Sequence, residues 1–343
     1  MNQKMILRFF LAIIFLTISL FGCRLPKSPD TYVPTVEPTI TRNAPSSEYQ
    51  HPFLKEAFMH PYGGTIELDW SHDGKYLLSY QTLMVIWDMQ TRSKSEFFYE
   101  CYLRDSVKWS PNDQYLAVNC KNKLQFLMAS SPFDILEEIP IVDDAISGIV
   151  WVDNTKILGA MENSRSLQSF SLDGIITEVS LPHSINDIYT EPNSEFIIGW
   201  GDGKVYYIVR EDYQFLQIHP CYPITRFNVA MENYLLACQN ISRDKLMIVD
   251  LSERDRKPIE LCATEVVNVL RWANNERYLV YCDVYSRCQI WDIPQKHLVW
   301  EIDFAEPVVD VSWSPGDDYL AISHYNGEIR IWNFRSILLE FQE

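Results

Sequence analysis

Residues 313–323 read WSPGDDYLAIS, and close copies of this stretch occur at residues 70–80 (WSHDGKYLLSY) and at residues 109–119 (WSPNDQYLAVN). In each copy a tryptophan is followed by a short polar segment and then by an apolar one. Pro315 fixes φ early in the polar segment and Gly74 tolerates a positive φ there, so both residues favour a tight turn. Each copy is therefore predicted to form two β-strands joined by a turn.

Weaker copies of this pattern fill the intervals between the three clear ones. The equivalent position in each copy, called the anchor position below, is occupied by Trp70, Trp109, Trp151, Thr190, Val229, Trp272 and Trp313. Consecutive anchors are 39 to 43 residues apart, a spacing typical of the four-stranded blade of a β-propeller. One blade cannot cover both of its apolar faces alone. The sequence therefore predicts an all-β domain over residues 51–343, a seven-bladed β-propeller of four-stranded antiparallel blades.

Three of the units continue into a third strand that ends in tryptophan followed by an acid or an amide. These endings are VIWDM at Trp87, QIWDI at Trp291 and RIWNF at Trp332. They resemble the dipeptide that names the WD40-repeat family, and the resemblance extends over roughly residues 55–343. Because stacking the blades in a ring buries their apolar faces, we expect the anchor tryptophans to pack between blades. The Gly-His pair of that family is absent, and the repeats resemble bacterial propellers with WSPDG-like turns equally well, so no specific partner follows from the resemblance.

Two segments are candidates for the strand that closes the ring. The last unit could supply its own outer strand around Ile337 to Phe341, and the segment from Phe53 to Met59 could instead add a strand from the N-terminal side. The sequence leaves both possibilities open.

The N-terminus has the features of an export signal. Lys4 and Arg8 precede an uncharged apolar run of 13 residues, from Phe9 to Phe21, which is short for a membrane span. The run ends in Gly22-Cys23, which resembles the bacterial lipobox, although Phe21 is bulkier than the residue usual there. The resemblance implies a signal peptide at residues 1–22, a lipid on Cys23 and a place in the cell envelope, on the extracytoplasmic side of a membrane. An uncleaved anchor and cleavage by the ordinary signal peptidase are the alternatives.

Residues 23–50 are predicted to be a linker between the lipid and the domain. From Arg24 to Gln50 the chain has five prolines and many serines and threonines, with no sustained apolar periodicity. Such a segment cannot build a core and favours an extended conformation.

The chain has eight cysteines, and seven remain once Cys23 is assigned to the lipid. Three candidate disulfides each join a cysteine just before a first strand to one near the end of the second strand: Cys101 with Cys120, Cys221 with Cys238, and Cys262 with Cys282. Cys288 is then unpaired, or it competes with Cys262 for Cys282. Seven free thiols are the alternative.

The formal net charge of −17 disfavours nucleic acid as a partner, because it repels the phosphate backbone. The seven histidines have no zinc-ligand spacing, and a Gly-x-Ser-x-Gly elbow, a phosphate-binding glycine loop and an EF-hand loop are all absent from the sequence. We therefore expect that the protein is not an enzyme and that it binds no metal and no cofactor. Paired carboxylates at the channel, as in a hydrolase or a lyase, remain an alternative.

The polar residues two to four positions before each anchor are predicted to begin the innermost strands and to form a rim at the channel mouth. They are Glu67, Asp105, Asp187, Arg226, Asn268 and Asp310. We expect a monomeric propeller, attached to the membrane by its lipid, that binds a protein or peptide through this rim and the central face. An envelope assembly factor is a further alternative, and solvated strand ends with no binding role would give the same pattern.

Overall fold

The computed structural model describes most of the chain after residue 50. The described residues are 51–98, 107–120, 122–130, 133–141, 145–162, 164–190, 194, 196–201, 204–209, 215–218, 224–240, 245–252, 257–262 and 265–340. The predicted signal peptide, Cys23, the linker and Asp105 lie outside these residues and stay predictions. In the described part of the chain, no helix has the length and apolar character needed to cross a membrane.

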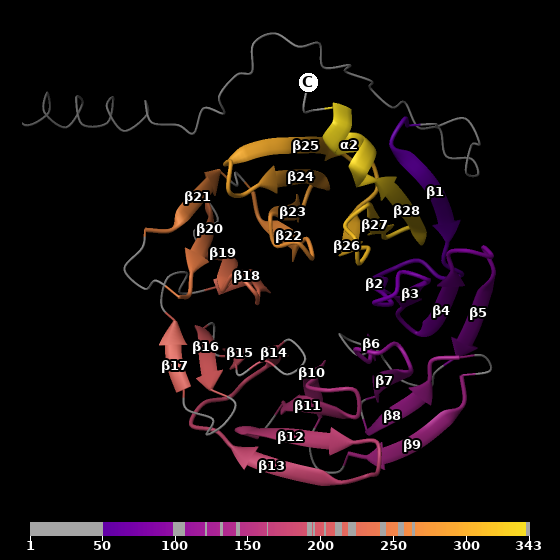
Figure 1. Ribbon diagram of the computed structural model, residues 1–343, viewed down its shortest axis with the longest axis vertical. Helices are drawn as coiled ribbons and strands as arrows, with labels where there is room; N and C mark the ends of the chain where they lie inside the picture. The colour runs from indigo at the N-terminus through magenta and orange to yellow at the C-terminus, as the bar shows by residue number, and fades with distance from the viewer. Residues whose placement is uncertain are drawn as a thin grey trace, which may run out of the picture. The chain divides into compact units, whose positions relative to one another are not determined.

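The described strands form seven four-stranded antiparallel sheets arranged radially around an axis, which confirms the predicted seven-bladed propeller (Figure 1). Blades 1 to 3 each follow chain order from the innermost strand to the outermost. Blade 1 has β2 (Glu67–Trp70), β3 (Tyr76–Tyr80), β4 (Leu83–Asp88) and β5 (Lys94–Phe98). Blade 2 has β6 (Val107–Trp109), β7 (Tyr115–Cys120), β8 (Lys123–Met128) and β9 (Ile135–Pro140). Blade 3 has β10 (Ile146–Trp151), β11 (Lys156–Met161), β12 (Ser166–Ser171) and β13 (Ile176–Ser180).

Blades 4 to 6 continue in the same order. Blade 4 has β14 (Asp187–Tyr189), β15 (Phe196–Gly201), β16 (Lys204–Val209) and β17 (Phe215–Ile218). Blade 5 has β18 (Ile224–Ala230), β19 (Leu235–Asn240), β20 (Lys245–Asp250) and β21 (Ile259–Cys262). Blade 6 has β22 (Val267–Trp272), β23 (Tyr278–Asp283), β24 (Arg287–Asp292) and β25 (His297–Asp303).

Blade 7 combines strands from both ends of the domain. Its three inner strands are β26 (Val308–Trp313), β27 (Tyr319–His324) and β28 (Glu328–Asn333), and its outermost strand is β1 (Leu54–Met59). β1 pairs antiparallel with β28, with Leu54 opposite Trp332 and Met59 opposite Glu328. The N-terminal strand therefore closes the ring.

The alternative prediction, a closing strand around Ile337 to Phe341, is wrong for residues 337–340. These residues belong to helix α2 (Phe334–Glu340). The outer edge of β28 is already occupied by β1, so no other strand can pair with β28 there. The Asn333 side chain accepts a hydrogen bond from the Ser336 backbone N–H (2.9 Å), as the N-cap of a helix does. Phe334 and Ile337, three residues apart, are the buried residues of α2.

The anchor tryptophans pack between blades, as predicted. Each of the five is 8% exposed or less. In three of them the indole N–H donates to the backbone carbonyl of the residue just before the anchor of the preceding blade: Trp70 to Ser312 (3.2 Å), Trp151 to Lys108 (3.1 Å) and Trp272 to Asn228 (3.3 Å). These bonds fix the register of one blade against the next.

A second set of bonds between blades comes from an acid four residues after the anchor. Asp113, Glu276 and Asp317 occupy this position with φ of 55°, 53° and 57°, in the left-handed region. Each carboxylate accepts hydrogen bonds from two consecutive backbone N–H groups in the equivalent turn of the preceding blade. The polar turns thus connect neighbouring blades.

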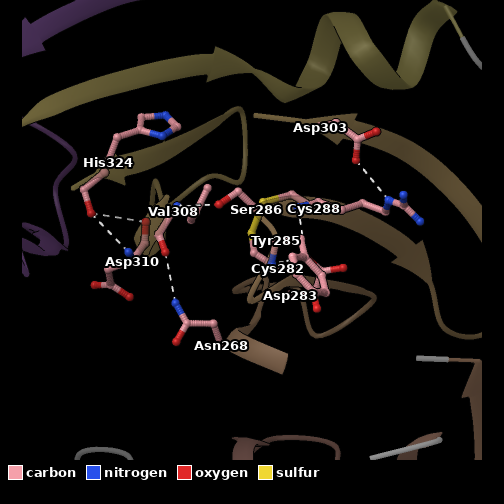
Figure 2. Close-up of a disulfide and its surroundings, with 12 residues drawn as sticks. Asn268, Cys282, Asp283, Tyr285, Ser286, Cys288, Asp303, Val308, Asp310 and His324 are labelled. Atoms are coloured by element: carbon pink, nitrogen blue, oxygen red, sulfur yellow. Dashed lines mark hydrogen bonds and ion pairs between the residues drawn. A yellow bond between two sulfur atoms is a disulfide. The ribbon is translucent and has the colours of Figure 1, made fainter. Parts of the chain in front are cut away.

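The disulfide predicted between Cys262 and Cys282 is wrong, because Cys282 is bonded to Cys288, which is the competing pairing that the sequence left open. Cys262 lies on β21, the outermost strand of blade 5, whereas Cys282 and Cys288 lie directly opposite one another on β23 and β24 of blade 6 (Figure 2). Cys120 and Cys238 also take part in disulfides, so the alternative of seven free thiols is wrong. Cys101 and Cys221, their predicted partners, lie outside the described residues, and these two pairings stay predictions.

The buried His324 predicts acid sensitivity of the fold. Its side chain lies against Phe304 (ring centroids 4.9 Å apart), and burial, assisted by Arg330, lowers its pKa from 6.5 to about 4. The unfolded chain therefore takes up a proton on this residue near pH 6.5 while the folded chain does not. The stability contributed by neutral His324 is complete above pH 6.5 and is lost as the pH falls towards 4.

We expect His324 to account for a loss of about 2 kcal/mol in unfolding free energy between pH 7 and pH 5. Urea unfolding at the two pH values measures it, and a His324→Gln variant should lose less stability over this interval by about that amount. The exposed His297→Gln variant is the control and should behave like the wild type. An unchanged pH dependence in the His324 variant would contradict the prediction.

Candidate binding site at the central channel

The innermost strands of all seven blades converge on a cavity of about 550 Å³. Its lining includes residues of β2, β6, β10, β14, β18, β22 and β26, the strands that surround the centre of the ring in Figure 1. The anchor tryptophans of blades 1, 6 and 7 contribute to its wall. The cavity is the central channel of the propeller.

The lining of the cavity carries charges of both signs, with carboxylates in excess. Apart from two tyrosines, its ionisable residues are Glu67, Asp69, Asp187, Asp310, Lys108, Arg271 and His72. Such a lining favours a partner that presents hydrogen-bond donors or a positive charge.

Asp310 is buried, at 5% exposed, and connects three blades. One carboxylate oxygen accepts the Leu68 backbone N–H of blade 1 (3.0 Å), and the other accepts a hydrogen bond from the Arg271 guanidinium of blade 6 (3.3 Å). Burial raises the pKa of Asp310, and the nearby Arg271 charge opposes that rise. The pKa of Asp69 is affected in the same way, because burial raises it while the charges of Lys108 and His72 oppose the rise.

Glu67 and Asp187 are held in the cavity wall by tyrosines. The Tyr80 hydroxyl donates to Glu67 Oε2 (2.8 Å), and the Tyr189 hydroxyl donates to Asp187 Oδ2 (2.8 Å). The neighbouring blade has Gly148 beside Asp187, where a Cβ atom would lie only 2.6 Å from the Asp187 Oδ1 atom. The glycine therefore leaves the space that the Asp187 carboxylate occupies.

The structure brings together three of the six predicted rim residues. Glu67, Asp187 and Asp310 all line the cavity. Asn268 does not, and its side-chain amide donates to the Val308 carbonyl of the next blade (3.0 Å, Figure 2). Arg226 lies on β18, is exposed and does not line the cavity either.

Sequence reasoning missed Asp69, Lys108 and Arg271, which occupy the position directly before an anchor. Side chains of a strand alternate between its two faces, so positions one and three before an anchor share a face and position four lies on the other. Glu67, Asp187 and Asp310 are at position three, whereas Asn268 is at position four. This period does not account for Arg226, which is also at position three and lies outside the cavity lining.

Among the described residues, no cluster of three or more histidine, cysteine, aspartate or glutamate side chains has the arrangement needed to hold a metal ion.

Comparison with known proteins agrees with this architecture. Residues 299–333, which run from β25 to the end of β28, match the WD40 family model, described as WD domain, G-beta repeat. The mouse (Mus musculus) WD repeat-containing protein WRAP73 is 22% identical over 310 residues, which cover 79% of this chain and 67% of that protein.

A similar solved structure is that of the β-propeller domain of Cps50 (Swd1) from Myceliophteria thermophila. It has a TM-score of 0.66 and 17% sequence identity, and the alignment covers 82% of this chain and 98% of that chain. At this identity the likeness concerns the fold alone. With its seven four-stranded blades this chain is a seven-bladed β-propeller, and its residues 299–333 are similar to a WD40 repeat.

Proposed function

We propose that this chain is a non-enzymatic scaffold that binds a protein or peptide partner through the rim and the central face of its propeller. WD40 propellers generally bind protein partners and are generally not catalytic. We further propose that a lipid on Cys23 holds the chain on the extracytoplasmic side of a membrane, with residues 23–50 as the linker to the domain. The N-terminal sequence pattern supports this second part.

The arrangement of carboxylates in the channel carries the binding proposal. Glu67 and Asp187 are oriented by tyrosine hydroxyls, and both oxygens of Asp310 are engaged by neighbouring blades. Acceptors held in place in this way suit the recognition of donor groups, because little freedom is lost when a partner binds. A hydrolase would need an acid and a base that are free to exchange protons with substrate, and Asp310 has a structural role instead.

We expect Glu67→Gln and Asp187→Asn to weaken partner binding by about five- to tenfold each, because each variant removes one charge from the channel. The partner is isolated with the full chain, tagged at its C-terminus, and its affinity for each variant is measured by calorimetry. Glu178→Gln, an exposed change on the outermost strand β13, is the matched control and should not alter the affinity.

Two outcomes would contradict the binding proposal. If all three variants bind the partner with equal affinity, the partner binds outside the channel. Hydrolysis in a panel of glycosides and peptides, abolished by Asp187→Asn, would favour the propeller enzyme instead.

The anchor is tested separately by metabolic labelling with palmitate. The wild-type chain is expected to incorporate the label and to enter the detergent phase of a phase partition, because several buried acyl chains give stable membrane attachment. Cys23→Ser should remove both properties, and Cys288→Ser should keep both. A Cys23→Ser chain that still enters the detergent phase would indicate an uncleaved N-terminal anchor.

A further inference from the structure

Three exposed tyrosines lie at one end of the ring, on both sides of the closure. Tyr285 is 72% exposed in the turn between β23 and β24, Tyr325 is 57% exposed in the equivalent turn between β27 and β28, and Tyr62 is 48% exposed between β1 and β2. Equivalent turns of neighbouring blades lie on the same face of a propeller. Tyr62 belongs to that face because β1 ends opposite Glu328, at the start of β28.

Backbone hydrogen bonds join the segments that carry these tyrosines. Gly64 N–H donates to Tyr325 O (2.7 Å), Tyr325 N–H donates to Pro307 O (2.9 Å), and Phe304 N–H donates to Ser286 O (3.0 Å). The loop of blade 6, the connection between blades 6 and 7, the loop of blade 7 and the segment after β1 are therefore contiguous. The three tyrosines therefore lie on segments of one face that backbone hydrogen bonds join to one another.

A disulfide and two hydrogen bonds constrain the loop that carries Tyr285. The disulfide between Cys282 and Cys288 joins its two ends, and Asp283 Oδ1 accepts the backbone N–H of Tyr285 (2.8 Å) and that of Arg287 (3.1 Å), as Figure 2 shows in part. Both cysteines are fully buried beneath the loop. An apolar ring that a covalently closed turn keeps in solvent is preorganised for contact with a partner.

A negative charge accompanies the tyrosines. Glu306 is exposed in the connection between β25 and β26, next to Pro307. Its backbone carbonyl is bonded to the His324 imidazole (3.3 Å), and its carboxylate has no ion-pair partner among the described residues. Together with the net charge of −17, this carboxylate favours a positively charged partner.

We infer that Tyr62, Tyr285, Tyr325 and Glu306, called the tyrosine surface below, bind an extended peptide segment rich in arginine and lysine. This inference rests on the proposed function and specifies the chemistry of the partner. The guanidinium and ammonium groups stack on exposed tyrosine rings, and a neighbouring cation pairs with Glu306. Tyr62 precedes β2, whose first residue, Glu67, lines the channel cavity, whereas none of the residues of the tyrosine surface lines that cavity.

The test uses the full chain in detergent and a fluorescent peptide of four Arg-Gly-Ser repeats, with four Glu-Gly-Ser repeats as the peptide control. Fluorescence anisotropy at roughly 0.15 M salt reports the affinity. Tyr285→Ala and Tyr325→Ala leave the charge of the chain unchanged and are each expected to weaken binding about threefold, and the double variant about tenfold. Glu306→Gln should weaken binding about twofold.

Matched controls separate the tyrosine surface from general attraction to an acidic protein. Leu339→Ala removes an exposed apolar side chain from α2, Glu178→Gln removes an exposed charge from β13, and Tyr285→Phe keeps the ring. All three should bind the arginine peptide like the wild type. Equal affinity of the tyrosine-to-alanine variants and the wild type would overturn the inference, as would the absence of any binding of the arginine peptide.

A variant without the disulfide gives an independent test of the inference. Replacing Cys282 and Cys288 by serine frees the Tyr285 loop and should weaken binding about threefold in protein whose thermal unfolding shows a folded ring. Unchanged binding in that folded variant would contradict the role of the preorganised loop. Loss of arginine-peptide binding in Glu67→Gln but not in the tyrosine variants would retain the channel as the binding site and reject the tyrosine surface.

Discussion

Deletion of residues 54–59 is expected to lower the unfolding free energy by about 5 kcal/mol and the Tm by about 10 °C or more. These residues form β1, and without them blade 7 has three strands and the edge of β28 is exposed. Phe58 of β1 also packs on Trp87 of blade 1, with ring centroids 4.8 Å apart. The deletion therefore removes both the pairing that closes the ring and packing across the closure.

Thermal and urea unfolding followed by tryptophan fluorescence measure the effect of this deletion. The control is a deletion of equal length at residues 36–41, within the predicted linker, which should leave both transitions unchanged. Equal stability of the two deletion variants would show that blades 1 and 7 hold together without β1, and that pairing of β1 with β28 contributes nothing to closing the ring.

The sequence predicted the number and order of the blades because that information is local and repeated. Every anchor identified from the pattern lies at or next to the end of an innermost strand, including Thr190 and Val229, where the tryptophan is missing. The strands and turns of a blade are close in the chain, so residue period and turn chemistry specify them. Seven independent copies of one weak signal then support the same architecture.

Ring closure is different, because it depends on a single pairing between distant parts of the chain. β1 lies more than 260 residues before β28, and the segment near Ile337 is as apolar as the segment near Phe58. Nothing local distinguishes them as partners of β28. The structure decides between them through Asn333, which begins a helix directly after β28 and takes the following residues out of strand geometry.

The cysteine pairing and the channel lining were predicted only in part for a related reason. The spacing of the cysteines assigned Cys262 to the same blade as Cys282. Cys262 instead belongs to β21, the outermost strand of the preceding blade. The predicted channel rim covers positions two to four before the anchor, so it includes Asn268 and Arg226, which lie outside the cavity lining, and omits Arg271, which lies one position before its anchor. Which blade and which face a residue belongs to are set by strand boundaries, and a repeat pattern locates these less precisely than it counts blades.

Asp317→Ala is expected to lower the unfolding free energy by about 3 kcal/mol. Asp317 Oδ1 accepts the Asn274 backbone N–H (2.8 Å) and side-chain amide (3.0 Å), and Oδ2 accepts the Asn275 N–H (2.8 Å). Alanine removes these three bonds between blades 6 and 7 and leaves the two backbone N–H groups of the exposed Asn274 and Asn275 without a protein acceptor. It must also adopt the φ of +57° of Asp317, which is unfavourable for a residue with a Cβ atom and no side-chain oxygen.

The Asp317→Asn variant separates the contribution of the charge from that of the acceptor geometry. Asparagine tolerates the left-handed region and keeps one carbonyl oxygen for the blade 6 turn. Because burial raises the pKa of Asp317, removing its charge offsets part of the lost hydrogen bonding, and we expect a cost of about 1 kcal/mol. Urea unfolding at pH 7 measures both variants. Asp318→Ala, an exposed neighbour, is the control and should cost less than about 0.5 kcal/mol.

The order of the three losses in unfolding free energy distinguishes two explanations of how neighbouring blades are held together. If the turn carboxylate connects them, Asp317→Ala costs most, Asp317→Asn costs less and Asp318→Ala costs almost nothing. If buried apolar packing alone holds blades 6 and 7 together, Asp317→Ala costs only the strain of its positive φ, about 1 to 2 kcal/mol, and Asp317→Asn and Asp318→Ala are as stable as the wild type. The second outcome would assign the recurring acid of Asp113, Glu276 and Asp317 to turn conformation within each blade, with no energetic role between blades.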